Sequence, residues 1–465
     1  MTLALLCVAQ FVVVLDVTSV AIALPAIQSD FGLSTTALGW VITAYTLTFG
    51  GCLLAAGRLA DRVGRRRAFS TGLALFGLAS LACGLAPTGG TLLAARATQG
   101  VGAALVAPAA LALLTTTRAD GDDRARALGW WTAAAAGGGA SGWLLGGLLT
   151  GVLDWRWVFF VNVPVCAAAL ALAPRVLPER REATPARPDV AGALLATLGL
   201  AALVLALTLA ESRGPAASDT LVSLVAAVVL LGAFALVEKR AADPLLGRAT
   251  LLRPGVREPN VVAAVLTATT TPPMFLCTLH AQQVLDLSPV AAGLLFPPFN
   301  AAVVAGSLAG PRVAATVGER SAMAGGLLAV AAGALALLAI APGAAALPSL
   351  LGGFVLLGAG LGVASVASTA RGTAALSGAD QGLASGLLST SAQVGTVLGL
   401  AVVVPIAAAR TGALDGGDAG AVAGYEIGFV LSAGAAAAAA LAVGIRARRA
   451  QPRPEHDACP HTLAA

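Results

Sequence analysis

Residues 57–67 read GRLADRVGRRR and separate two long apolar runs, residues 38–59 and 69–87. Arginine fills five of these eleven positions. A charged turn on the cytoplasmic side of a membrane would account for the arginines, because such loops are rich in basic residues. It does not account for Gly57, Asp61 and Gly64, whose spacing is G-x-x-x-D-R-x-G-R-R. The segment therefore predicts a specific turn between two membrane-spanning helices.

The composition of the whole chain agrees with a membrane environment. Of the 465 residues, 58% are hydrophobic and 11% are charged, whereas soluble domains have about 45–50% apolar and about 25% charged residues. At about 20 apolar residues per span, the chain has room for a dozen or more spans. A water-soluble multidomain enzyme is excluded. The net charge of +5 is too small and too scattered for nucleic-acid binding.

Long apolar runs predict an all-α membrane protein with fourteen membrane-spanning helices. They fall near residues 3–27, 38–59, 69–87, 91–114, 127–149, 157–174, 190–210, 220–237, 260–281, 289–309, 322–341, 347–367, 383–407 and 425–445.

The distribution of basic residues predicts the orientation of these helices. If the N-terminus is cytoplasmic, 24 of the 28 basic residues fall in cytoplasmic segments and three fall outside, while Arg96 lies within a span. Cytoplasmic loops carry the excess of basic residues. The sequence therefore predicts an even number of spans with both termini in the cytoplasm.

Two polar segments, residues 174–188 and 238–258, bracket two spans that contain almost no polar residues. This pattern predicts two six-helix halves, residues 1–188 and 239–446, joined by an inserted helix pair at residues 189–238. A cytoplasmic tail would follow at residues 447–465. The pair is expected to face lipid, because helices that line an aqueous path carry polar residues.

Asp16 and Arg96 are the two charged residues that lie inside predicted spans and away from their ends. An aspartate near the centre of a span costs about 2.5–3.5 kcal/mol on insertion scales, so it is functional by default. A structural ion pair is the alternative for Asp16, and an arginine that extends to the membrane edge is the alternative for Arg96. Gln99 follows Arg96 by three residues and shares its helix face.

The spacing in residues 57–67 resembles the signature loop of the major facilitator superfamily, with every defining position present. Residues 15–25, LDVTSVAIALP, and residues 96–102, RATQGVG, resemble the helix 1 and helix 4 motifs of its fourteen-helix drug:proton antiporters. Further matches are WVITAYTL at 40–47, WRWVFFVNVP at 155–164 and HAQQVLDLSPVAAG at 280–293. Together they extend the resemblance from about residue 5 to residue 445.

Two segments depart from the family pattern. The corresponding loop of the second half, residues 311–320, keeps Arg312 and Gly318 but has Ala315 in place of the aspartate. Residues 137–147, GGGASGWLLGG, resemble the antiporter motif of exporters, but Trp143 stands where that motif has proline. This helix alone therefore does not indicate the direction of transport, and its glycines are equally expected of close helix packing.

The resemblance implies roles for individual residues. The gating loop would comprise Gly57, Asp61, Arg62, Gly64, Arg65 and Arg66, with Asp61 holding a neighbouring helix end rather than binding substrate. Asp16 and Arg96 would couple transport to protons. Polar residues in the spans are candidates for the substrate cavity. Residues 271–273 and 296–300 contain paired prolines that mark broken or polar helix regions, for which kinks that serve packing alone are an equal explanation. The candidates are Thr18, Tyr45, Gln99, Asn300 and Gln393.

The resemblance implies a major facilitator fold and proton-coupled efflux of lipophilic drugs, antibiotics or natural products across the cytoplasmic membrane by alternating access. A carrier for uptake or export of one specific metabolite is the alternative. The sequence has no G-x-x-x-x-G-K-[ST] loop, so ATP is not expected to drive transport. We expect no enzyme activity, no catalytic residue and no metal or other cofactor. The expected partners of this multi-pass monomer are a lipophilic small molecule, protons and the lipid bilayer.

Overall fold

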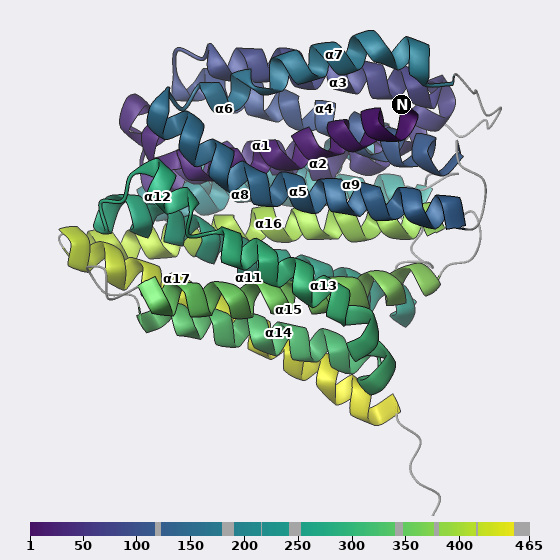
Figure 1. Ribbon diagram of the computed structural model, residues 1–465. Helices are drawn as coiled ribbons and strands as arrows, with labels where there is room; N and C mark the ends of the chain where they lie inside the picture. The colour runs from purple at the N-terminus through teal and green to yellow at the C-terminus, as the bar shows by residue number, and fades with distance from the viewer. Residues whose placement is uncertain are drawn as a thin grey trace, which may run out of the picture.

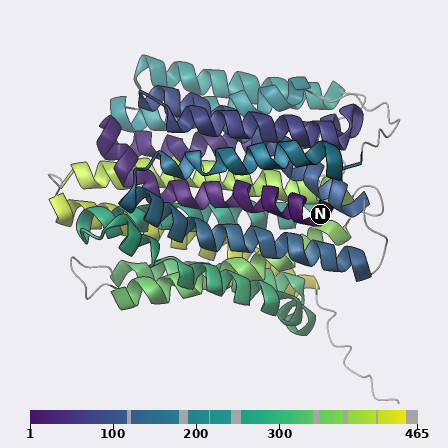
Figure 2. The ribbon, with the colours of Figure 1, turned by 45° about the horizontal axis from the view of Figure 1, so that its top comes forward.

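The computed structural model describes residues 1–116, 122–178, 190–214, 216–240, 253–339, 347–375, 381–414 and 417–450. Within these ranges the chain forms helices and no strand. The helices run side by side along one common axis, as two views of the molecule show (Figures 1 and 2). Twelve of the described helical segments are long and apolar enough to cross a membrane.

The first bundle contains α1 to α7. Its α1–α2 turn is built from a left-handed Gly32 (φ 63°), which ends α1, and from Ser34, whose side chain accepts a hydrogen bond from the Ala37 N–H at 3.1 Å. Glycine and serine are the residues that these two cap positions favour. The helices are α1 (Thr2–Phe31), α2 (Thr35–Val63), α3 (Arg65–Gly84), α4 (Gly89–Thr116), α5 (Asp122–Val152), α6 (Trp157–Phe160) and α7 (Asn162–Val176).

The second bundle contains α11 to α17. Pro254, Pro289 and Pro297 stand in the first turns of three of its helices, where a missing N–H has no cost. The helices are α11 (Pro254–Leu279), the π-helix η1 (His280–Val284), α12 (Pro289–Gly293), α13 (Pro297–Val317), α14 (Glu319–Ala336), the short η2 (Leu337–Ala339), α15 (Leu347–Ala374), α16 (Gln381–Gly412) and α17 (Gly417–Ala450).

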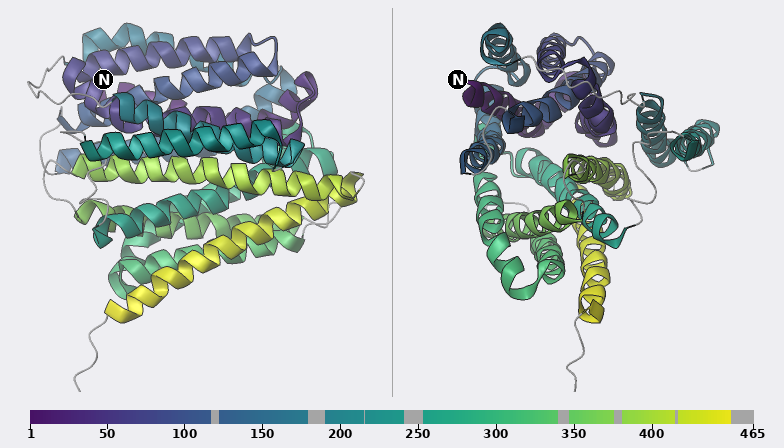
Figure 3. Two further views of the ribbon diagram at one scale, coloured as in Figure 1. Left: turned by 180° about the vertical axis from the view of Figure 1, so that it is seen from behind. Right: turned by 90° about the vertical axis from the view of Figure 1, so that its right-hand side faces the viewer.

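Two further helices, α8 (Val190–Arg213) and α9 (Ser218–Arg240), form a pair beside the two bundles (Figure 3, right). Val204 of α8 packs in one cluster with Leu47 of α2 and Val397 of α16, so α8 touches both bundles. On α9, the side chains of Val222 and Val228 are 68% and 66% exposed. Such apolar exposure suits contact with lipid, as the sequence predicts for this pair.

The two bundles repeat one turn. Gly64 between α2 and α3 has φ 104° and ψ 128°, and Gly318 between α13 and α14 has φ 83° and ψ 151°. Each glycine donates its N–H to the carbonyl four residues earlier, on Ala60 and Ala314 respectively, and the next helix starts at the following residue. Only glycine adopts this backbone region readily. The correspondence predicted between residues 57–67 and 311–320 therefore extends to the backbone.

Gly32 and Gly64 lie at opposite ends of α2, and we name the two ends of the molecule after them. The Gly64 end also holds the N-terminus and the end of α7, because Thr2 bonds to the Val176 carbonyl at 3.2 Å. The Gly32 end lies opposite, at the other end of α2. In Figure 1 the N-terminus marks the side of the Gly64 end.

The helices differ from the predicted spans at a few points. The predicted spans 127–149 and 190–210 fall on α5 and α8, which are helical but are not among the twelve. The predicted spans 157–174 and 289–309 are each divided, into α6 with α7 and into α12 with α13. Outside the described residues lie parts of the two predicted polar segments, at 179–188 and 241–252, the link at 340–346 between the predicted spans 322–341 and 347–367, and the tail from 451 onward.

Candidate functional site

Asp16 lies in the middle of α1 with no exposed surface. Its Oδ2 accepts a hydrogen bond from Arg96 Nη1 at 2.6 Å. Its Oδ1 accepts two more, from Gln99 Nε2 at 2.8 Å and from Asn162 Nδ2 at 2.7 Å. Each of these bonds uses a lone pair of the carboxylate, so the surroundings are those of an ionised acid held by three donors.

Arg96 of α4 is equally buried, with 1% of its side chain exposed. Besides Asp16, it donates to Gln99 Oε1 at 2.6 Å and, through Nε, to the Val41 carbonyl at 3.0 Å. The guanidinium also lies over the Tyr45 ring, 4.4 Å from its centroid, an arrangement that favours a cation. The alternative in which Arg96 extends to the membrane edge is therefore wrong.

Ser80 of α3 completes this group, which we call the polar cluster: Asp16, Ser80, Arg96, Gln99 and Asn162. Ser80 Oγ accepts from Gln99 Nε2 at 2.7 Å and lies 3.5 Å from Asn162 Nδ2. The cluster joins α1, α3, α4 and α7 through one ion pair and neutral groups. A buried pair with its remaining hydrogen bonds satisfied is stable, whereas loss of one partner is costly.

The sequence predicted part of the polar cluster. It singled out Asp16 and Arg96, and the structure brings them into direct contact. Gln99 was predicted for the substrate cavity, but its fully buried amide lies in the polar cluster. Asn162 lies in segment 155–164, which resembles the family, and that resemblance was the only feature of the sequence that pointed to it. Ser80 gave no signal, because a serine in an apolar helix is common.

The other cavity candidates lie apart from the polar cluster, except Tyr45, whose ring packs on Arg96. Thr18 Oγ1 donates to the Leu15 carbonyl at 3.2 Å and faces Gly138 of α5. Asn300 of α13 donates to the Phe296 carbonyl at 3.4 Å. Gln393 of α16 packs against Gly50 of α2, because a Cβ added to Gly50 would lie 2.5 Å from the Cβ of Gln393. Asn300 and Gln393 thus lie where the two bundles meet.

The predicted gating loop forms the end of α2 and the start of α3. Gly57 lies inside α2, and Gly64 makes the turn. Arg66 Nη1 donates to the Leu177 carbonyl at 3.3 Å and to the Pro174 carbonyl at 3.5 Å, at the end of α7. A cation is favoured there by the helix dipole. Arg65 also makes interactions, while the side chains of Asp61 and Arg62 lie outside the described residues.

The second bundle has an ionic cluster of its own at the Gly64 end. Glu258 of α11 is 4% exposed, and its Oε2 lies 3.0 Å from Arg320 Nε and 3.6 Å from Arg371 Nε. Arg371 also pairs with Glu319 at 3.3 Å. The group joins the ends of α11, α14 and α15. Its residues lie near predicted span ends, where charge is ordinary, so the sequence did not distinguish them.

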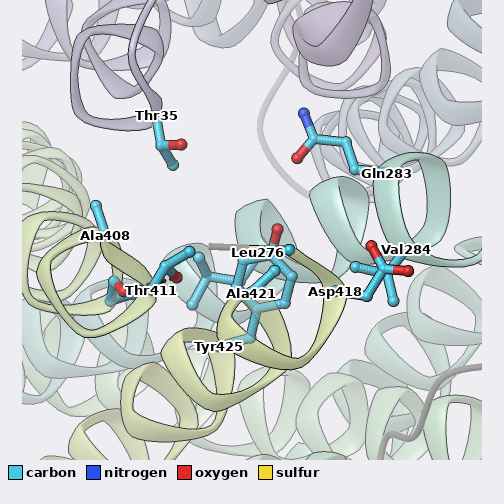
Figure 4. A pocket seen from close by; sticks show the side chains of 11 residues that line it. Thr35, Leu276, Gln283, Val284, Ala408, Thr411, Asp418, Ala421 and Tyr425 are labelled. Carbon is cyan, nitrogen blue, oxygen red and sulfur yellow. Dashed lines mark hydrogen bonds between the residues drawn. The ribbon is translucent and has the colours of Figure 1, made fainter. Parts of the chain in front are cut away.

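The two bundles touch at the Gly32 end. Gln282 Nε2 donates to the Ile22 carbonyl at 2.9 Å, and Gln283 Nε2 donates to Gln28 Oε1 at 2.6 Å. A pocket of about 230 Å³ lies beside these contacts. In Figure 4 the side chains of Thr35 and Gln283 lie across from Tyr425. Drug-sized ligands need about 300–1,000 Å³, so this pocket does not hold one in the present conformation.

His280 lies next to this contact, in η1, and is fully buried. Its ring meets the Tyr425 ring edge-on, with centroids 6.1 Å apart. Neither ring nitrogen has a hydrogen-bond partner among the described residues. The imidazole is therefore held by packing alone.

Comparison with known proteins gives consistent matches over most of the chain. A family model described as Major Facilitator Superfamily matches residues 6–400. The puromycin resistance protein pur8 of Streptomyces alboniger is 41% identical over 92% of this chain and 87% of that protein. The cephamycin export protein CmcT of Amycolatopsis lactamdurans is 39% identical over 88% of this chain and 85% of its own length.

A crystal structure of a peptide transporter, POT, in complex with sulfate is similar in fold, with a TM-score of 0.70. The match covers 96% of this chain and 94% of that one, at 18% sequence identity. At this identity the likeness concerns the arrangement of the helices.

Proposed function

Because the chain belongs to the Major Facilitator Superfamily, we propose that it exports lipophilic antibiotics or related natural products in exchange for protons. It is a multi-pass protein of the cell membrane. Support for export comes from relatives whose names specify puromycin resistance and cephamycin export. It acts as a carrier and not as an enzyme. We propose a monomer as the working unit, and the polar cluster is complete within one chain, as such a unit requires.

The proposed topology has fourteen spans with both termini in the cytoplasm, so the Gly64 end is cytoplasmic. Support comes from the charges at that end, which include Arg66, Arg320 and Arg371. It also comes from α5 and α8, which occupy the two predicted spans outside the set of twelve. The Gly32 end then faces the exterior.

The moving bodies are residues 1–188 and residues 239–446, with the pair at 189–238 between them and a tail at 447–465. In alternating access these bodies rock about a substrate site between them. Thr18, Tyr45, Asn300 and Gln393 are the proposed cavity residues. The loop with Asp61 and Arg62 limits the rocking at the cytoplasmic end, where Arg66 already fixes α3 to the end of α7.

The polar cluster is the observation that carries proton coupling. A proton on Asp16 removes the charge that pairs with Arg96 and turns one carboxylate oxygen into a donor, so the bonds from Arg96, Gln99 and Asn162 weaken or rearrange. Those donors belong to α4 and α7, and protonation thus changes how α1 is held in its bundle. A proton that crosses 100 mV supplies about 2.3 kcal/mol, enough to bias such a rearrangement.

The test is transport in proteoliposomes under an imposed pH gradient, with puromycin as the substrate. We expect Asp16→Asn to lower gradient-driven transport at least tenfold, because an amide cannot carry the proton. The matched control is Asp30→Asn, on the same helix but 41% exposed, which should transport like the wild type. Full gradient-driven transport by Asp16→Asn would contradict the assignment.

A carrier of one specific metabolite is the second candidate for the function. A panel of structurally unrelated lipophilic compounds separates the two, because an exporter with a broad cavity accelerates the movement of several of them. Acceleration of a single compound would favour the specific carrier.

A further inference from the structure

Trp143 of α5 lies face to face on Phe296, with ring centroids 3.9 Å apart and planes 10° apart. Phe296 continues the row to Phe354 of α15, with centroids 5.1 Å apart. The three side chains are 5%, 0% and 1% exposed. Trp143 comes from the first bundle and both phenylalanines come from the second, so this stack crosses the boundary between the bundles.

The stack lies between the level of Asp16 and the Gly32 end. Gly142, next to Trp143, packs on Thr18 of α1, and Gly146 packs on Ser19 and Ile22. Asn300, a proposed cavity residue, lies one helical turn from Phe296 on the side of the Gly64 end. A compound in that cavity would therefore meet the stack on its way to the exterior.

Around the stack the two bundles touch backbone to backbone. A Cβ added to Gly293 would lie 2.6 Å from the Trp143 carbonyl oxygen, and one added to Gly147 would lie 2.6 Å from the Pro289 carbonyl oxygen. Both distances are too short for any side chain. The glycines thus let α5 close directly against α12, and the stack fills the space beside that contact.

The indole N–H of Trp143 is buried and has no acceptor among the described residues. Buried tryptophan N–H groups usually find a partner, and a buried donor that lacks one destabilises the folded state. A donor left unpaired in one conformation is explained if another conformation supplies its acceptor. Trp143 also stands where the antiporter motif has proline, so nothing in that motif accounts for it.

We propose that Trp143 and Phe296 form a separable aromatic pair with two roles. Stacked, they seal the transport path toward the exterior. Apart, they bind a flat aromatic group of the exported compound, and the Trp143 N–H donates to an acceptor on that group. The binding role rests on the proposed export function, whereas the sealing role does not.

The energetics suit a contact that opens in every cycle. An aromatic pair contributes only a modest free energy beyond the area that it buries. A substrate ring that replaces one partner restores most of that contact. The exchange therefore needs little net free energy.

The seal is tested by proton leak into proteoliposomes in the absence of any substrate. We expect Trp143→Ala to raise the leak several-fold, because water then passes the gap, and Phe296→Ala to do the same from the opposite side. Trp143→Phe keeps a ring in place and should restore a tight seal. The matched control is Trp130→Ala, on the same helix but 62% exposed.

The binding role is tested by equilibrium binding to the purified, nanodisc-embedded protein. Puromycin, which has a purine and a substituted phenyl ring, is compared with cephamycin C, which has no aromatic ring. We expect Trp143→Ala to weaken puromycin binding at least tenfold and Trp143→Phe, which keeps an aromatic ring but lacks the N–H, to weaken it about three- to fivefold. Cephamycin C binding should change by less than twofold in both variants.

The outcomes separate the two roles. Wild-type leak in Trp143→Ala and Phe296→Ala would overturn the seal, whatever the substrate is. Unchanged puromycin binding in both Trp143 variants, or a wild type that binds cephamycin C but not puromycin, would overturn the aromatic binding role. A failure of wild-type export with a leak that still depends on Trp143 would overturn the proposed function and leave the seal supported.

Discussion

The two bundles bury their charges at different depths. The first bundle holds the Asp16–Arg96 pair away from its helix ends, with Asp16 in the middle of α1 and both side chains at most 1% exposed. In the described part of the second bundle, the buried carboxylate of Glu258 lies near a helix end with Arg371, whereas Glu426, further inside α17, is partly exposed. Charge in the middle of a membrane is costly. Depth therefore separates a pair suited to proton coupling from a cluster that fastens helix ends.

The largest effect is expected for Arg96→Ala in the first bundle. The substitution leaves Asp16 as a buried charge without its counter-ion, which costs about 3–5 kcal/mol. Thermal unfolding of the purified protein would show a markedly lower midpoint. The double variant Asp16→Asn with Arg96→Ala should recover much of that loss while remaining inactive in proton coupling. If the double variant is no more stable than Arg96→Ala, the charge pair is not the source of the effect.

An intermediate effect is expected for Glu258→Gln in the second bundle. Two arginines lose a shared carboxylate, but both are about one quarter exposed, so we expect a loss of about 1–2 kcal/mol. The proton dependence of transport should stay as in the wild type, because this cluster lies at a helix end. Stability and the response of transport to a pH gradient are measured in parallel. Loss of the gradient response would contradict the view that only the charge pair of the first bundle serves proton coupling.

The smallest effect is expected for His280→Leu. The imidazole has no hydrogen-bond partner among the described residues, so an apolar side chain of similar size removes the cost of burying it. The free energy of unfolding should change by less than about 1 kcal/mol, and in the stabilising direction. A large loss of stability or of transport would show that the imidazole has a partner in another conformation.

Much of the fold was predictable because each membrane-spanning helix requires a long run of apolar residues. Runs of apolar residues predicted fourteen spans, and the structure has helices at all fourteen positions, of which twelve are long and apolar enough to cross a membrane. The break at Val161 between α6 and α7 was not predicted, because Val161 is itself apolar. The break before Pro297 falls in the proline-rich segment 296–300, which the sequence marks as a broken or polar helix region.

The candidate site was predictable only in its charged members. Asp16 and Arg96 stand out because each is expensive in lipid, but Ser80 and Asn162 are ordinary neutral residues. Their importance comes from helices that are distant in sequence but meet at Asp16; Asn162 and Asp16 are separated by 146 positions in the sequence. Similarly, Trp143 looks like a departure from a motif until its ring is seen against Phe296.

The helix pair α8–α9 has a consequence for how a lipophilic compound reaches the carrier. Two lateral seams separate the bundles, one between α2 and α16 and the other between α5 and the α12–α13 segment. The pair covers the first seam, because α8 packs on both α2 and α16. The second seam, the one beside Trp143, has no extensive contact with α8 or α9 among the described residues. A compound that entered from the lipid would therefore have to enter on the Trp143 side.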